Sequence, residues 1–115
     1  MTLVSVVIPA FNAEDYLATS IQSVLLQTHQ LVDVIVVDNA STDGTPLVTG
    51  RFDDPRLRSV EVQVNRGVGR GRNIGAAACE GDLVAFLDAD DQWDRTKLED
   101  QIAILNADPR LVALG

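Results

Sequence analysis

Two aspartates stand two residues apart behind an apolar segment, and their type and spacing suit the binding of a cation. Asp88 and Asp90 follow residues 83–87, and Asp91 adds a third carboxylate. If the strand geometry of the apolar run persists, the side chains of Asp88 and Asp90 point to the same face. Carboxylates that lie close together repel one another, and a divalent cation relieves that repulsion. Oxygen ligands without His or Cys suit Mg²⁺ or Mn²⁺, so the segment predicts a metal site. The alternative is a turn leading into a helix, where Asp is also favoured.

A second polar segment follows the apolar run of residues 32–37. Asp38 stands directly behind that run, and its carboxylate can accept hydrogen bonds from a base or a ribose, so we favour a ligand contact. Asp43 and Gly44, a few residues later, form a typical turn before a helix. For this pair we favour a structural role.

A glycine-rich basic segment covers residues 65–75. Gly67, Gly69 and Gly71 do not have the spacing of the dinucleotide-binding fingerprint, and the lysine of a phosphate-binding P-loop is absent. The segment is therefore interpreted as a basic loop that enters a helix. Arg66 and Arg70 either contact a diphosphate or are simply solvated, whereas Arg72, with Asn73, is better placed at the helix start.

Apolar runs predict the strands that must position these side chains. They are rich in β-branched residues and nearly continuous, which is typical of strands buried on both faces of a parallel sheet. The predicted strands cover residues 3–8, 32–37, 57–64 and 83–87, and a fifth begins at residues 111–114.

Segments with helical spacing separate these strands. The predicted helices cover residues 14–27, 44–52, 70–79 and 94–106. Asn12 and Asp94 are the expected N-caps of the first and the last helix. Residues 70–79 are rich in Gly and Ala, so that this helix can approach a sheet closely. The alternation predicts one α/β domain over residues 1–115, with right-handed crossovers and its ligand outside the carboxyl ends of the strands.

Composition excludes several classes of protein. The net charge is −8, which argues against a nucleic-acid-binding surface, although six Arg and only three acids lie in residues 51–75. One cysteine, Cys79, excludes an internal disulfide framework and a cysteine-built zinc site, and the single His29 excludes a histidine-rich one. No signal peptide and no apolar run of about 18 residues is visible, so we expect a cytoplasmic chain.

The four polar segments together resemble the N-terminal, nucleotide-sugar-binding half of the family 2 glycosyltransferases, which have the GT-A fold. Residues 4–14 are similar to the family's first strand and turn, and residues 36–45 to its second-strand motif. Residues 72–75 resemble its Arg-Asn-x-Gly helix. Residues 86–93 resemble its metal-binding DXD motif, and residues 97–99 the helix that follows. The resemblance implies a Rossmann-like, mainly parallel sheet flanked by helices, truncated at its C-terminal side.

The resemblance also implies roles for individual residues. Asp90 would hold Mn²⁺ or Mg²⁺ on the diphosphate, and Asp88 would contact the metal or the ribose. Asp38 and Asn39 would lie against the base. The implied substrate-binding residues are Pro9, Ala10, Phe11, Glu14, Asp38, Asn39, Arg72, Asp88 and Ala89. The metal would stabilise the negative charge that builds on the leaving phosphate during sugar transfer.

Two departures from the family pattern matter. Asn39 replaces a second Asp found in many relatives, and because Asn donates as well as accepts hydrogen bonds, the preferred base can differ. The catalytic base of the family is expected beyond residue 115, so no residue here is assigned to it. We therefore expect a partial chain, in which transfer would be inverting only if the missing part supplies the base.

Three functions remain open at this point. The first is the donor-binding half of a metal-dependent glycosyltransferase that makes a cell-surface polysaccharide or glycoconjugate, with a saccharide or lipid-linked acceptor. The second is a nucleotide-diphosphate-binding module that does no chemistry on its own. A sugar-phosphate nucleotidyltransferase is less favoured, because residues 9–12 stand where its basic glycine-rich loop would be. Truncation would expose an edge strand and an apolar face, so we expect self-association, and the complete protein could associate with a membrane.

Overall fold

The computed structural model describes residues 2–64 and 68–107 of the chain. Within these residues, four strands alternate with four helices. The strands are β1 (Val4–Ala10), β2 (Val32–Asn39), β3 (Leu57–Val62) and β4 (Leu83–Phe86). The helices are α1 (Leu17–Leu25), α2 (Thr45–Thr49), α3 (Val68–Ala77) and α4 (Lys97–Ala107).

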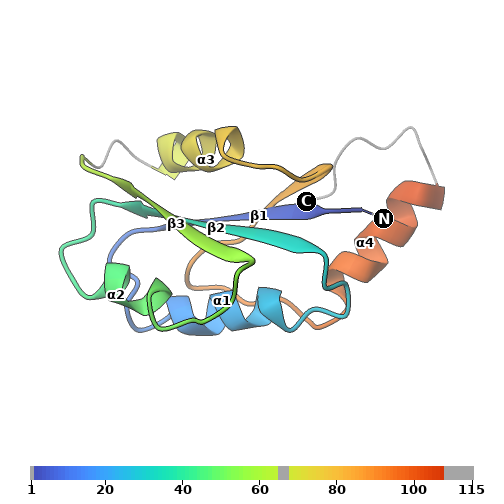
Figure 1. Ribbon diagram of the computed structural model, residues 1–115, viewed down its shortest axis with the longest axis horizontal. Coiled ribbons are helices and arrows are strands. Elements are labelled where there is room, and N and C mark those ends of the chain that lie inside the picture. The colour runs from blue at the N-terminus through green and yellow to red at the C-terminus, as the bar shows by residue number, and fades with distance from the viewer. Residues whose placement is uncertain (1, 65–67, 108–115) are drawn as a thin grey trace.

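The strands form one parallel sheet in the order β3-β2-β1-β4. Helix α3 lies on one side of this sheet, and α1 and α2 lie on the other (Figure 1). All four carboxyl ends therefore meet at one edge, as predicted for a parallel α/β domain. The predicted Rossmann-like, helix-flanked sheet is confirmed.

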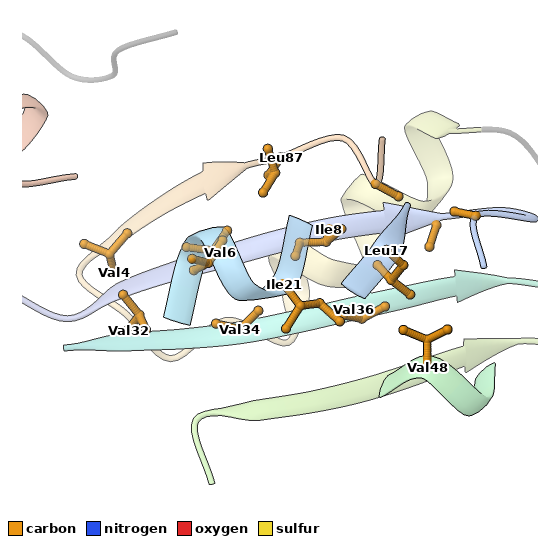
Figure 2. Close-up of a cluster of buried hydrophobic side chains, with 14 of the residues drawn as sticks. Val4, Val6, Ile8, Leu17, Ile21, Val32, Val34, Val36, Val48 and Leu87 are labelled. Atoms are coloured by element: carbon orange, nitrogen blue, oxygen red, sulfur yellow. The ribbon is translucent and has the colours of Figure 1, made fainter. Parts of the chain in front are cut away.

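The larger hydrophobic core fills the space between the sheet and α1. Val6 and Ile8 of β1 and Val34 of β2 point toward this helix, where Leu17 and Ile21 meet them (Figure 2). These side chains are fully buried. The opposite faces of the same strands bury Val7, Ile35 and Val37 under α3. Burial on both faces explains why these two strands are nearly continuous apolar runs.

Helix α3 meets the sheet through small residues. Gly71 and Gly75 are buried, whereas Arg72 and Asn73 between them are exposed. A Cβ on Gly75 would lie 2.2 Å from Val7 Cγ1 and 3.1 Å from Val37 Cγ2. The close approach predicted from the Gly- and Ala-rich sequence is confirmed.

A partly buried carboxylate ties three strands together. Asp33 of β2 accepts hydrogen bonds from Ser5 Oγ of β1 at 3.1 Å and from Arg58 Nε and Nη2 of β3 at 3.2 and 3.1 Å. Partial burial raises the pKa of Asp33, but the hydrogen bonds and charge of Arg58 and the Ser5 hydrogen bond outweigh it and leave the pKa below 3.8. Asp33 is therefore negatively charged at neutral pH.

We expect the substitution Asp33→Asn to destabilise the chain at neutral pH by about 1 kcal/mol, since Arg58 is partly exposed and the pair is screened. A depressed folded pKa gives stability that is present above about pH 4 and lost as the pH falls through the folded value. The difference in unfolding free energy between Asp33→Asn and wild type should therefore vanish in acid. Urea unfolding between about pH 2 and pH 7 measures it. The exposed Asp53 provides the control, because Asp53→Asn should change little at any pH. A pH-independent loss in Asp33→Asn would contradict the charge argument.

Several predicted boundaries need correction. Strands β1 and β2 run two residues past their predicted ends, β3 stops at Val62 rather than residue 64, and β4 stops at Phe86. Each predicted helix differs at its ends by a few residues from α1–α4. The predicted fifth strand at residues 111–114 lies outside the described residues.

Both predicted N-caps are wrong. α1 begins only at Leu17, after a turn in which the N–H groups of Tyr16 and Leu17 donate to the Ala13 carbonyl. Asn12 lies before this turn with φ 47°, and its side chain is bonded to another loop. α4 begins at Lys97, whose N–H donates to the backbone carbonyl of Asp94 rather than to its side chain.

Candidate functional site at the carboxyl edge of the sheet

The predicted nucleoside-binding residues lie at the carboxyl ends of β1 and β2. Ala10 is paired in register with Asp38, and both are buried. Pro9 is half-buried, and the Phe11 ring, just past the strand, is 49% exposed. This edge thus carries an exposed aromatic ring just past β1 and a buried carboxylate on the neighbouring strand β2.

Asp38 and Asn39 are the last two residues of β2, and both are almost fully buried. The Asp38 Oδ1 accepts a hydrogen bond of 3.2 Å from the Ser41 N–H. Ala40, the residue directly after β2, has a left-handed φ of 59°, which turns the chain sharply after the strand. A groove of about 250 Å³ opens here, lined by Asp38, Ala40, Ser41, Pro46, Glu61, Val62 and Gln63. The sequence-predicted Asp38 thus borders a groove.

Hydrogen bonds between the loops after β1 and β2 fix this edge. The Asn12 N–H donates to Ser41 Oγ at 3.0 Å, and Asn12 Oδ1 accepts the Thr42 N–H at 2.8 Å. The buried Thr45 Oγ1 accepts the Ala13 N–H at 2.8 Å. Segments about thirty residues apart are therefore held as one unit.

Glu14 and Asp43 belong to the same unit. The Gly44 N–H donates to Glu14 Oε2 at 2.9 Å, so this carboxylate supports the turn, and its contact with substrate stays a prediction. Desolvation raises the pKa of Asp43, but hydrogen bonds from Thr45 and from the Glu14 N–H outweigh it and keep the pKa below its usual value. The structural role favoured for Asp43 and Gly44 is confirmed.

The acidic turn, residues 88–91, follows β4. Leu87 and Ala89 are buried, whereas Asp88 and Asp90 are exposed. The strand geometry assumed for both aspartates does not persist, because β4 ends at Phe86 and the Asp91 N–H closes a turn onto the Asp88 carbonyl at 3.0 Å. Burial of Leu87 and Ala89 nevertheless turns both carboxylates to solvent.

Arg72 joins the acidic turn to α3. Its Nη2 lies 3.4 Å from Asp88 Oδ1, and its guanidinium carbon lies 5.7 Å from the centroid of the Phe86 ring. Both members of the ion pair are about half-exposed, and exposed pairs of this kind contribute little stability. A diphosphate could therefore displace Asp88 from Arg72 at low cost. Of the two contacts that were left open, Arg70 is exposed in α3, and Arg66 lies outside the described residues.

The acidic turn suits a cation only in part. Among residues 2–64 and 68–107, no three His, Cys, Asp or Glu side chains form a ligand group for one ion. Mg²⁺ is commonly held by one or two carboxylates, with substrate phosphates and water completing the shell. Asp88 and Asp90 fit that donor set, which would be complete only with a diphosphate present.

Two buried polar residues, one in α1 and one in the turn that follows it, were not predicted from the sequence. Gln27 donates from Nε2 to the Ser23 and Asp94 carbonyls, and its Oε1 accepts the Leu98 N–H at 3.1 Å. Ser20 bonds the backbone of the acidic turn. Their position in the sequence could have indicated their burial, because both lie on the apolar stripe with Leu17 and Val24.

No helix in the described part of the chain is long and apolar enough to cross a membrane.

Residues 5–115 of the chain match the protein family described as "Glycosyl transferase family 2". The chain is 40% identical over 105 residues to TuaG of Bacillus subtilis (strain 168), a glycosyltransferase named for teichuronic acid biosynthesis, covering 90% of this chain and 42% of TuaG. It is 32% identical to WfaP of Escherichia coli, named as a UDP-Glc:alpha-D-GlcNAc-diphosphoundecaprenol beta-1,3-glucosyltransferase, covering 94% of this chain and 43% of WfaP. The chain thus spans less than half the length of these relatives.

A solved structure shares the fold. The mannosyltransferase PcManGT from Pyrobaculum calidifontis, in complex with GDP-Man and Mn²⁺, superposes with a TM-score of 0.86 at 31% identity. The match covers 94% of this chain and 33% of the mannosyltransferase. The predicted GT-A architecture is confirmed, and this chain corresponds to a portion of it.

Proposed function

Because the chain belongs to glycosyltransferase family 2, we propose that its carboxyl edge is the donor site of a metal-assisted sugar transferase. The donor would be a nucleoside-diphosphate sugar. One observation carries this proposal: Arg72 links α3 to the acidic turn at the same edge where Asp38, near the end of β2, borders a groove. One sheet edge would thus supply the carboxylate that binds the base, the cation that binds phosphate and the carboxylates that hold the metal.

The nucleoside would bind at the ends of β1 and β2. Asp38 borders the groove and can accept hydrogen bonds from a base or ribose. Asn39 adds an amide that can donate and accept. Pro9, Ala10 and Phe11 would provide backbone and packing contacts around the nucleoside. The braced loops keep these groups in place before the ligand arrives, which reduces the entropy cost of binding.

The diphosphate would lie over the acidic turn. Asp88 and Asp90 would hold Mn²⁺ or Mg²⁺, with Ala89 offering its backbone to the donor, and Arg72 would exchange Asp88 for a phosphate oxygen. When bound, the metal supplies Lewis-acid stabilisation of the charge that develops on the leaving diphosphate. The relatives support this proposal, since WfaP is named for UDP-Glc and the structure of PcManGT contains GDP-Man with Mn²⁺.

Transfer would break the bond between the anomeric carbon and the diphosphate oxygen and form a bond to an acceptor hydroxyl. The acceptor proton must go to a base, which we place in the part of the protein beyond residue 115, and with such a base the transfer would be inverting. A saccharide or lipid-linked acceptor agrees with the diphosphoundecaprenol acceptor in the name of WfaP. The proposed location is the cytoplasm, at a membrane where the acceptor is lipid-linked. Alone, the chain would be a nucleotide-diphosphate-binding module.

Thermal unfolding with UDP, GDP, CDP or dTDP, each with and without Mn²⁺, tests the donor site. A nucleotide at about 100 times its dissociation constant adds roughly 2.7 kcal/mol of stability, which is several degrees in melting temperature for a domain of this size. We expect such a shift with at least one nucleotide when Mn²⁺ is present, and a clearly smaller shift with the same nucleotide in EDTA. Mn²⁺ alone and each nucleotide with EDTA are the controls. The absence of any shift in all four mixtures would overturn the proposal.

A further inference from the structure

Ser20 is a polar residue on the apolar stripe of α1. It is 1% exposed and lies between Leu17, Ile21 and Val24, all fully buried. Serine is less favourable than alanine inside a helix, partly because its hydroxyl competes for local backbone groups. The Ser20 hydroxyl bonds a distant segment instead, which accounts for a serine at this core position.

That distant segment is the acidic turn. Ser20 Oγ lies 2.7 Å from the Ala89 carbonyl oxygen and also within hydrogen-bond reach of the Asp91 carbonyl. The hydroxyl has one proton, so the two carbonyls share it. These carbonyls belong to the residues on either side of Asp90. The backbone is therefore held to α1 immediately before and after that aspartate.

Burial of Ala89 is a second restraint on the backbone next to Asp90. Ala89 is 8% exposed and packs in the core that includes Leu17 and Ile21, so the turn cannot rotate without exposing it. Asp90 itself is exposed. Its residue and Ser20 line the same cavity of about 170 Å³, between the start of α1 and the acidic turn. Ser20 thus fixes the backbone from which the proposed metal ligand projects.

We propose that Ser20 is a positioning residue for Asp90, holding the acidic turn in the conformation that binds a metal–nucleoside diphosphate complex. The inference rests on the proposed function, because it needs the metal site at Asp90. Ser20 itself touches neither metal nor substrate. Its loss should therefore weaken the metal-dependent part of binding and leave the nucleotide contacts at Asp38 in place.

The test compares Ser20→Ala with Ser23→Ala in the 115-residue chain. Ser23 lies on the same helix, but its Oγ donates to the Ser20 carbonyl at 2.7 Å and not to the acidic turn. Mn²⁺ is titrated by calorimetry in the presence of UDP, GDP, CDP or dTDP, and nucleotide binding is measured again in EDTA. Amide hydrogen exchange of Asp91, whose N–H bonds the Asp88 carbonyl at 3.0 Å, reports on the turn without any ligand.

We expect Ser20→Ala to raise the half-saturating Mn²⁺ concentration about tenfold, the scale typical of a lost outer partner of a metal ligand. Asp91 exchange should become faster, whereas nucleotide binding in EDTA and the Ser23→Ala variant should match wild type. An unchanged Mn²⁺ titration in Ser20→Ala, beside a wild type that responds, overturns the inference alone. A wild-type chain that binds no nucleotide with Mn²⁺ overturns the proposed function as well.

Discussion

The substitution Asp90→Asn is expected to abolish the Mn²⁺-dependent stabilisation of the chain by its nucleoside diphosphate. The several-degree shift in melting temperature, worth roughly 2.7 kcal/mol at saturating ligand, should disappear. Asn keeps the shape of the side chain but removes the negative charge that a hard divalent cation requires. Without ligand, the variant should unfold as wild type does, since Asp90 is exposed and the turn is held by backbone bonds and by buried Ala89.

Asp91→Asn is the matched control for this experiment. Asp91 is the next exposed carboxylate, and its Oδ1 accepts the N–H of Gln92 at 2.9 Å. If the site is specific, Asp91→Asn should keep most of the shift, while Asp90→Asn loses it. Equal losses in both variants would indicate a general effect of negative charge on Mn²⁺. A full shift in Asp90→Asn would show that the metal is held elsewhere.

The central part of the fold can be predicted from the sequence because each buried strand is visible as an apolar run in its own segment. Residues such as Val6 and Val36 lie in apolar runs, and burial on both faces of a parallel sheet is the simplest way to remove them from water. The strand ends could not be predicted in the same way. Asp38 and Asn39 are polar and are weak strand formers, yet they pair in register because neighbouring strands hold them.

The candidate site could be predicted in outline, because the residues behind parallel strands must meet at one edge. Its detailed contacts could not. Asn12 is a residue type that often caps helices, but its carboxamide oxygen instead accepts a hydrogen bond from the Thr42 N–H, thirty residues away. Ser20 has nothing in its neighbouring sequence that indicates a special role, because its hydrogen-bond partner, the Ala89 carbonyl, lies 69 residues away. Hydropathy periodicity describes which face is buried, and it carries no information on which distant backbone group a buried polar atom meets.

The substitution Gly75→Ala is expected to destabilise the chain by about 1–3 kcal/mol, the usual cost of overpacking a core. The new methyl group would lie 2.2 Å from Val7 Cγ1, and Val7 is fully buried in β1. The better helix propensity of alanine, up to about 1 kcal/mol, offsets only part of this cost. Urea unfolding measures the loss. Because relief of the overlap would move α3, which carries Arg72, we also expect weaker nucleotide binding with Mn²⁺.

Gly71→Ala separates this overlap from the general effect of removing a glycine. Gly71 lies one helical turn earlier on the same buried stripe of α3, but its added Cβ would be 3.6 Å from Pro9 Cβ, an ordinary contact distance. This variant should therefore keep or gain up to about 1 kcal/mol from alanine's helix propensity. If the free energy of unfolding falls in Gly75→Ala but rises in Gly71→Ala, Gly75 sets the distance between α3 and the sheet. A gain in stability for Gly75→Ala would instead mean that α3 packs with room to spare, and that the position of Arg72 depends on other contacts.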